Sequence, residues 1–264
     1  LQYGIRHIGG VYMSRQKKTP IIINDIAPHT VKKFELVEKY VDEWARKILG
    51  IKNSKGVIFI DCMCNSGLYS SSDGESVIGT PIRIAKLLNG IIENYSGKEA
   101  LLFFNDFEQA KIDALSAEIT SLNLTNIRVS YSTGDGNDFL KTFQVNRYPN
   151  HNKLLFYDPY EASIDWDAIS PFLRCWGEVI INHMISDTVR GITQANRPDT
   201  VQKYERTYQI SKNDLLMLGY DRTTLDDVVE GIISRYSEGL KNKTFIASFP
   251  FYNRNNVLLY NLIH

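Results

Sequence analysis

The feature that most constrains the fold of this chain is a repeated alternation of short apolar runs with segments of helical periodicity. Short apolar runs that end in a polar residue are typical of strands buried on both faces of a parallel sheet. Five such runs lie at residues 57–61, 101–105, 127–131, 154–157 and 178–182. Helical patterns precede or separate them at residues 30–50, 81–92, 108–122, 137–143 and 165–173, with Thr30 as the expected cap of the first helix. The alternation predicts β-α-β units with right-handed crossovers, and therefore a doubly wound sheet.

The C-terminal end follows a different pattern. Residues 244–249 and 257–263 are two further apolar runs, and only residues 250–256 connect them. A connection that short leaves no room for a helix and forces an antiparallel pair of strands. A mostly parallel sheet that ends in an antiparallel β-hairpin is the arrangement of class I methyltransferases, and it differs from nicotinamide-binding Rossmann domains. We therefore predict an α/β fold of the class I methyltransferase-like type.

We expect one domain over residues 29–264, preceded by an N-terminal extension over residues 1–28. The residues before Met13 are expected to derive from an expression vector. A helical insertion is predicted at about residues 184–224, near the edge of the sheet where open α/β folds bind ligands. This insertion is either a surface helical hairpin, which is the preferred interpretation, or a lid over a substrate.

Composition and charge exclude several classes of protein. With 30 basic and 30 acidic residues, the chain lacks the concentrated positive charge of a protein that coats nucleic acid, although a local basic cleft is compatible with this balance. The 43% of hydrophobic residues suffices for a continuous core and argues against disorder. No run approaches the roughly 20 apolar residues that span a bilayer, so we expect no membrane association.

The cysteines indicate a reduced environment. Cys62, Cys64 and Cys175 are odd in number and irregularly spaced, unlike a disulfide framework, so we expect a cytoplasmic protein. Cys62 and Cys64 are too close together for a zinc knuckle, and no second pair or nearby histidine completes a site. We therefore expect no bound metal.

The first candidate for ligand binding is the loop that begins at Asp61, directly after the first predicted strand. A glycine in such a loop lets the backbone approach a cofactor closely, because glycine has no side chain to obstruct it. The predicted cofactor contacts in this loop are Asp61, Cys62, Asn65 and Gly67. The alternative is an ordinary β-α turn with a capping Asn or Ser.

Acidic residues also follow the next two predicted strands. Asp106, with Phe107 beside it, is placed to accept both ribose hydroxyls of an adenosine-type cofactor. Asp135, next to Gly136, is placed to accept a hydrogen bond from an adenine amino group. Each residue alone could be a helix N-cap, for which Asp is a preferred residue. Because these positions follow consecutive strands, cofactor binding is the favoured interpretation.

Asp158-Pro159-Tyr160 ends the fourth predicted strand. It is similar to the Asp-Pro-Pro-Tyr signature of methyltransferases that act on amino nitrogens. In that signature the acid and a proline-held carbonyl accept hydrogen bonds from the target amine, and the aromatic ring stacks on the planar acceptor. Here the second proline is absent, and a structural Asp-Pro turn is an equally weighted alternative. The predicted catalytic residues are Asp158, Pro159 and Tyr160.

Several segments together resemble the three-Cys-motif partner proteins. They are the helix HTVKKFELVEKYVDEWARKIL, the strand and loop FIDCMCNSGLY, the helix start GTPIRIAKLL, and the later FNDFE, YDPYEASIDW and VLLYNLIH. The resemblance runs from about His29 to the end of the chain. The family pattern Phe-Ala-Gly-x-Gly is changed here, since Asn65 replaces its first glycine, and Gly-Ser-Pro becomes Gly79-Thr80-Pro81.

The resemblance implies a methyltransferase-like protein that binds S-adenosylmethionine. The family is often encoded beside a radical S-adenosylmethionine-type protein with three cysteines, in mobile or phage-related settings, so such a protein is a candidate partner. Three residues are candidate substrate contacts. Lys33 matches the lysine of the family's opening motif, Tyr69 ends the second motif, and His183 stands at a predicted strand end.

Three hypotheses follow. The first is an S-adenosylmethionine-dependent methyltransferase that acts on an amino or amide nitrogen, with a nucleic acid base as a candidate acceptor. The second is a non-catalytic subunit that binds a nucleotide or nucleic acid and delivers it to a partner enzyme. The third is a hydrolase or nuclease in which Asp61, Asp106 and Asp158 bind a divalent metal.

Overall fold

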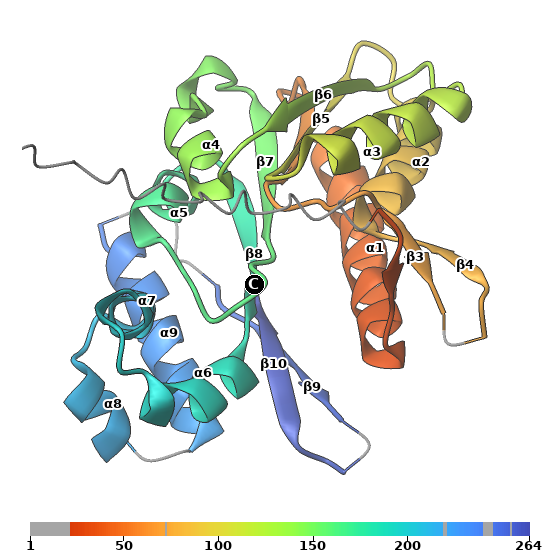
Figure 1. Ribbon diagram of the computed structural model, residues 1–264. Coiled ribbons are helices and arrows are strands. Elements are labelled where there is room, and N and C mark those ends of the chain that lie inside the picture. Colours follow the sequence, from red (N-terminus) through yellow and green to blue (C-terminus); the bar gives the residue numbers. More distant parts are fainter. Residues whose placement is uncertain (1–21, 72, 219–220, 240–244, 254) are drawn as a thin grey trace, which may run out of the picture.

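Seven strands form one sheet in the order β6-β5-β2-β7-β8-β10-β9. The structure, a computed structural model, describes residues 22–264 apart from residues 72, 219–220, 240–244 and 254. The strands are β2 (Gly56–Asp61), β5 (Glu99–Asp106), β6 (Arg128–Thr133), β7 (His151–Tyr157), β8 (Gly177–His183), β9 (Ser248–Tyr252) and β10 (Leu258–Ile263). From β6 to β8 all neighbours are parallel, whereas β10 is antiparallel to both β8 and β9 (Figure 1). The predicted class I methyltransferase-like fold is confirmed.

Helices cover both faces of this sheet. One face packs against α1 (Pro28–Leu49), α2 (Thr80–Ile92) and α3 (Gln109–Ser121). The other face packs against α4 (Gly136–Thr142), α5 (Trp166–Leu173) and α9 (Arg222–Ser237) (Figure 1). A short 3₁₀ helix, η1 (Val145–Arg147), leads into β7.

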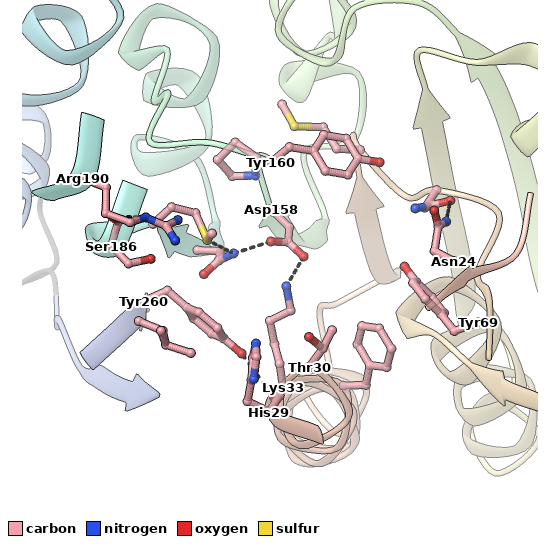
Figure 2. Close-up of a pocket in the computed structure, with 17 residues that line it drawn as sticks. Asn24, His29, Thr30, Lys33, Tyr69, Asp158, Tyr160, Ser186, Arg190 and Tyr260 are labelled. Carbon is pink, nitrogen blue, oxygen red and sulfur yellow. Dashed lines mark hydrogen bonds and ion pairs between the residues drawn. The ribbon is translucent and has the colours of Figure 1, made fainter. Parts of the chain in front are cut away.

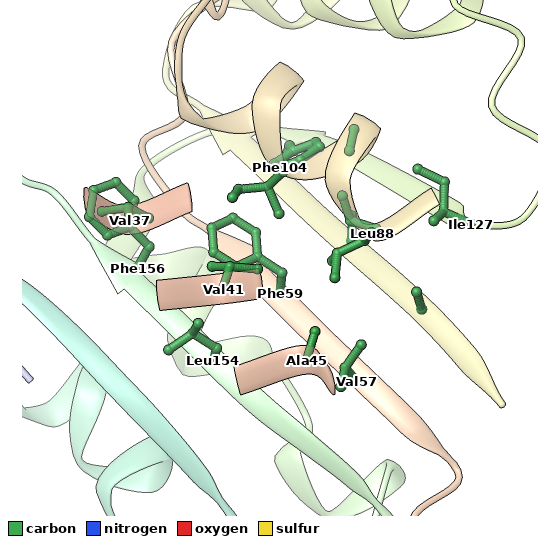
Figure 3. Packing of buried hydrophobic residues seen from close by; sticks show 14 of the residues in the cluster. Val37, Val41, Ala45, Val57, Phe59, Leu88, Phe104, Ile127, Leu154 and Phe156 are labelled. Carbon is green, nitrogen blue, oxygen red and sulfur yellow. The ribbon is translucent and has the colours of Figure 1, made fainter. Parts of the chain in front are cut away.

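Strand β2 lies at the centre of the sheet and is buried along its whole length. Because successive side chains of a strand point to opposite faces, Val57 and Phe59 join the core beneath α1 and α2, whereas Ile58 and Ile60 join the core beneath α5 and α9. Figure 3 shows Phe59 packed among side chains of α1 and of neighbouring strands. Burial on both faces explains why β2 reads as an uninterrupted apolar run.

The segment predicted as an insertion is largely helical. After β8 come α6 (Ile185–Gly191), η2 (Ile192–Gln194), α7 (Pro198–Tyr208) and α8 (Lys212–Met217). Ile185, Tyr204, Tyr208 and Leu215 are buried in the same core as α5 and α9. The insertion is therefore integrated into the domain core rather than lying on its surface as a separate hairpin.

A second sheet of three short strands was not predicted. It consists of β1 (Asn24–Asp25), β3 (Leu68–Ser70) and β4 (Ser76–Ile78), in the order β1-β3-β4. Strand β1 lies within residues 1–28, which were predicted to form an N-terminal extension. It nevertheless pairs in parallel with β3. The end of that stretch is therefore part of the domain, while residues 1–21, including the proposed vector-derived start, lie outside the described residues.

Two predicted element boundaries are wrong. Helix α1 begins at Pro28 with Ala27 as its N-cap, so Thr30 lies inside the first turn and caps nothing. Strand β9 runs over Ser248–Tyr252 rather than 244–249, and Thr244 lies outside the described residues. Pro250 suggested a turn but is part of β9, which is an edge strand and so tolerates a residue without an N–H donor.

In the part of the chain that the structure describes, no helix is both long enough and apolar enough to cross a membrane.

Candidate functional site

A cavity of about 480 Å³ opens where the carboxyl ends of the parallel strands meet the start of α1. The loop after β2 supplies Met63 and Asn65, and the turn after β7 supplies Asp158-Pro159-Tyr160. Figure 2 shows Asn24 and Tyr69 at one end of the cavity, Arg190 and Ser186 at the other, and Asp158 between them. The carboxyl edge of an open α/β sheet is the expected place for a ligand.

Asp158 is held from two sides. Lys33 Nζ lies 2.6 Å from its Oδ2, and Asn182 Nδ2 donates to its Oδ1 over 2.5 Å. Lys33 reaches this position because it lies in the second turn of α1, on the face that packs against the sheet, where it is 7% exposed. Its ammonium also lies 5.5 Å from the centre of the Tyr260 ring. The buried lysine and the strand-end carboxylate therefore form an ion pair in the cavity wall.

Asn65 takes the place of a loop glycine. Its backbone φ is 57° and that of Gly67 is 69°, both in the left-handed region. Asparagine is among the few residues besides glycine that adopt this conformation readily. The Asn65 side-chain oxygen also accepts hydrogen bonds from the Ser66 N–H and from Asn24 Nδ2. The loop thus adopts at Asn65 a backbone conformation that glycine adopts most readily.

Asp106, at the end of β5, fastens the same loop. Its Oδ2 accepts the Asn65 N–H over 2.9 Å, and its Oδ1 accepts the Glu108 N–H over 3.0 Å. Tyr160 Oη lies 3.5 Å from the same Oδ2. Lys111 Nζ lies 4.0 Å from Oδ1. Because a carboxylate oxygen has about two lone-pair positions and Oδ2 already has two donors, Oδ1 is the oxygen that keeps a position for a further donor. Asp106 is buried and ties β5 to the loop, and its role in binding a ribose stays a prediction.

Asp61 is fully buried at the end of β2, and its Oδ1 accepts the Met63 N–H over 3.2 Å. Burial, reinforced by the nearby charge of Asp158, raises the pKa of its carboxyl well above the usual range. Burial and the same carboxylates also raise the pKa of Tyr69 and of Tyr160, so both phenols are neutral. The buried Asp61 carboxyl and both phenols therefore favour their uncharged forms.

Of the predicted cofactor residues, Asn65 lines the cavity, whereas the others lie beside it: Asp61, Cys62, Gly67, Asp106, Phe107, Asp135 and Gly136. Asp135 caps α4 by accepting the N–H groups of Asn137 and Asp138, as the alternative interpretation of this position foresaw. Gly136 packs closely, since an added Cβ would lie 2.7 Å from the Cys62 carbonyl oxygen. Phe107 is 77% exposed and presents its ring to solvent next to Asp106.

His183 is not a cavity residue, contrary to the expectation that it contacts a substrate. It is fully buried, with Nδ1 2.6 Å from Asp226 Oδ1 and Nε2 2.8 Å from Tyr208 Oη. Tyr208 in turn pairs with Thr188 Oγ1 over 2.7 Å. The physical reason is strand alternation: Asn182 lines the cavity, so the next side chain of β8 points away from it. His183 joins β8 to α7 and α9.

The cavity residues that were not predicted include Asn24, Asn182, Arg190 and Tyr260. Asn182 could have been considered as a cavity residue, because it precedes His183 at the same strand end. Successive side chains of a strand point to opposite faces, so only one of these two residues can face the cavity. Asn24 was missed because the extension was given no role in the fold. Tyr260 and Arg190 reach the cavity from β10 and α6, through contacts that are remote in sequence.

Comparisons with known proteins give weak similarities. No family model matches the chain, and no curated protein matches it. Among solved structures, a candidate rRNA methylase from Clostridium thermocellum is 12% identical, with a TM-score of 0.42 and coverage of 90% of this chain and 97% of that one. An rRNA methylase from Streptococcus thermophilus is 11% identical, with a TM-score of 0.38 and coverage of 83% and 92%. A candidate methyltransferase from Streptococcus mutans, solved with S-adenosylhomocysteine, is 14% identical, with a TM-score of 0.38 and coverage of 84% and 95%.

Proposed function

We propose that this protein is an S-adenosylmethionine-dependent methyltransferase that acts on an amino or amide nitrogen of a nucleotide or nucleic acid base. One observation carries the proposal. Asp158-Pro159-Tyr160, at the end of β7, lines the same cavity as the loop after β2, in a sheet that ends in an antiparallel hairpin. The acceptor motif and the cofactor loop are thus brought to one place.

The residues present fit this cofactor. The left-handed backbone at Asn65 and Gly67 shapes a loop that can approach the methionine moiety closely. Asp106 Oδ1 accepts one N–H and would have a position for one ribose hydroxyl, and the exposed Phe107 ring beside it offers an apolar face for adenine.

When bound, S-adenosylmethionine supplies an electrophilic methyl group. The protein's part is to orient the acceptor. Asp158 would accept a hydrogen bond from the acceptor amine, and this bond strengthens as positive charge develops on the nitrogen. Pro159 would fix the turn that aims Asp158. The exposed ring of Tyr160 would stack on the planar acceptor. Lys33 keeps Asp158 in place and balances its charge, acting as a positioning residue.

The charge of the cavity favours an anionic acceptor. Lys33 is neutralised by Asp158, and burial together with Lys33 lowers the pKa of His29, which is therefore uncharged at neutral pH. Arg190 donates through Nε to the Ser186 carbonyl, and no carboxylate of the described chain forms an ion pair with it. Its guanidinium leaves one uncompensated positive charge at the cavity end. Phosphate is a ligand that guanidinium binds well, and nucleotides and nucleic acids supply it.

The competing hypotheses gain less support. Within the described residues no group of three His, Cys, Asp or Glu side chains is arranged to hold a metal ion, so the metal-dependent hydrolase hypothesis lacks its central feature. The relation to the three-Cys-motif partner proteins rests on the sequence motifs and stays a prediction. The same holds for a radical S-adenosylmethionine-type partner with three cysteines. The cytoplasmic location also stays a prediction.

The test is isothermal titration of the protein with S-adenosylmethionine and S-adenosylhomocysteine. We expect micromolar binding that Asp106→Ala abolishes. Asp113→Ala, which removes an exposed carboxylate of α3 bonded to Gln109, is the matched control and should bind normally. A folded protein that binds neither ligand would refute the proposal. Transfer of labelled methyl groups to RNA or DNA then tests the acceptor class.

A further inference from the structure

Asn182 carries a buried oxygen that no donor reaches. Its Nδ2 donates to Asp158 Oδ1 and lies 3.4 Å from Met184 Sδ. The other end of the amide, Oδ1, is buried and has no hydrogen-bond partner in the described part of the chain. Asn182 is 2% exposed and lines the cavity. Because a buried acceptor without a donor is unfavourable, an orphaned oxygen in a cavity wall indicates that a ligand supplies the donor.

The orientation of this amide is fixed by its neighbour. If the Asn182 amide were rotated by half a turn, its oxygen would face a carboxylate oxygen of Asp158 at 2.5 Å, and both atoms are acceptors. The donor nitrogen must therefore face Asp158, which leaves Oδ1 as the free atom. The unpaired oxygen thus follows from hydrogen-bond chemistry and does not depend on an arbitrary choice of amide orientation.

We propose that Asn182 Oδ1 accepts the second N–H of a primary exocyclic amino group whose first N–H is bound by Asp158. This inference rests on the proposed methyltransferase function and narrows its acceptor to a base such as adenine or cytosine. Lys33 and Asn182 occupy one lone pair on each oxygen of Asp158, so a further position remains for the substrate. A primary amine has two donors to satisfy both oxygens, whereas a hydroxyl has one and a ring carbon none.

The arrangement also limits transfer to one methyl group. The acceptor nitrogen forms its bond to the methyl carbon as the sulfur–methyl bond breaks, the electron pair stays on sulfur as a thioether, and one amino proton leaves to solvent. The product nitrogen then keeps a single N–H. It can satisfy Asp158 or Asn182 but not both, so the monomethylated base binds more weakly and is not methylated again.

The experiment is titration of the S-adenosylhomocysteine-bound protein with two matched sets of nucleotides. The sets are AMP, N6-methyl-AMP and IMP, and CMP, N4-methyl-CMP and UMP, which share the phosphate and differ at the amino position. For at least one set we expect the primary amine to bind about tenfold more tightly than its methylated and deaminated counterparts. In Asn182→Leu the preference over the methylated nucleotide should fall below about twofold, with affinity for S-adenosylhomocysteine unchanged.

Asn261 is the matched control. Its Nδ2 donates to Asp226 and its Oδ1 is likewise buried without a partner, but it lies outside the cavity wall. Asn261→Leu should keep the tenfold preference. Asn182→Ala replaces Asn182→Leu if the latter does not fold.

Each contrary outcome is decisive. Equal binding of primary and methylated amines by the wild-type protein overturns the inference, and so does an unchanged preference in Asn182→Leu. Binding of S-adenosylhomocysteine without binding of any nucleotide overturns the acceptor class but leaves the cofactor proposal standing. Failure to bind S-adenosylhomocysteine overturns the proposed function itself.

Discussion

At the scale of single residues, the ion pair between Lys33 and Asp158 is the contact that most defines the site. Both charges are largely withdrawn from water, and Asn182 supplies the second donor to the carboxylate. Burying one charge without the other is costly, so each residue depends on its partner. Neither residue predicts the other in sequence, because α1 and the end of β7 are far apart in the chain.

Lys33→Met should therefore destabilise the protein by about 2 kcal/mol, since it leaves Asp158 in the cavity wall without its cation. Lys33→Met combined with Asp158→Asn should recover part of that loss, because no uncompensated charge remains. Urea denaturation of the wild type, both single variants and the double variant gives the coupling energy. Strictly additive effects would show that the pair contributes nothing to folding.

The left-handed backbone at Asn65 gives a second prediction. Asn65→Ala should be less stable than Asn65→Gly by about 1 kcal/mol, because alanine lacks glycine's freedom to adopt the left-handed backbone. The side-chain oxygen of Asn65 bonds to Ser66 and Asn24. Both variants lose those bonds, so their difference isolates the backbone cost. Equal unfolding free energies would mean that the loop relaxes to another conformation.

Asp61 makes stability depend on pH. Burial raises its folded-state pKa well above the unfolded value, so the folded chain binds the proton more tightly. Its contribution is fully present below the ordinary pKa of an aspartate and is lost as the pH rises through the folded-state value. Asp61→Asn should therefore gain stability relative to the wild type over the pH range above the ordinary aspartate pKa, by up to about 1.4 kcal/mol per pH unit. Urea midpoints measured across this range test the sign, and a constant difference would contradict it.

At the scale of elements, the strand ends decide which residues form the site and which hold the fold. Asn182 and His183 are neighbours in β8, yet the first faces the cavity and the second joins a buried network with Asp226. The sequence could place both at a strand end but could not assign their faces, because β8 is buried on both sides and shows no polar alternation. Tertiary packing alone separates their roles.

His183→Phe should accordingly lower the melting temperature while leaving affinity for S-adenosylhomocysteine unchanged in the folded protein. The ring would fit poorly, and Asp226 and Tyr208 would each lose a partner, at a cost of about 2 kcal/mol or more. Thermal denaturation and titration well below the transition separate the two effects. A large loss of ligand affinity without loss of stability would show that His183 acts in ligand binding and would contradict its structural role.

At the scale of the whole molecule, the order of apolar runs predicted the sheet well because each strand of a parallel sheet must be buried on both faces. The second sheet escaped prediction, since β1, β3 and β4 are only two or three residues long and β1 pairs with a segment distant in the chain. The cavity residues differ in the same way in how well the sequence predicts them. Residues at ends of β-α strands were predictable, whereas Asn24, Arg190 and Tyr260 come from the less regular parts.

Ligand binding should stabilise the molecule as a unit, because the cavity draws residues from both ends of the chain. S-adenosylhomocysteine at a hundredfold excess over its dissociation constant should raise the free energy of unfolding by about 2.7 kcal/mol. Asp106→Ala should show no such increase at the same concentration. Denaturation with and without ligand provides the measurement, and equal increases in the two proteins would indicate binding elsewhere.

Strand β10 follows β9 in the chain but lies between β8 and β9 in the sheet. During synthesis β9 is therefore made before its partner β10, and the edge of β8 that β10 will occupy stays unpaired until β10 is inserted. Because β10 also brings Tyr260 to the cavity wall, a nascent chain that lacks this strand has an incomplete pocket. The order of translation thus delays completion of the cavity until the sheet can be closed around it.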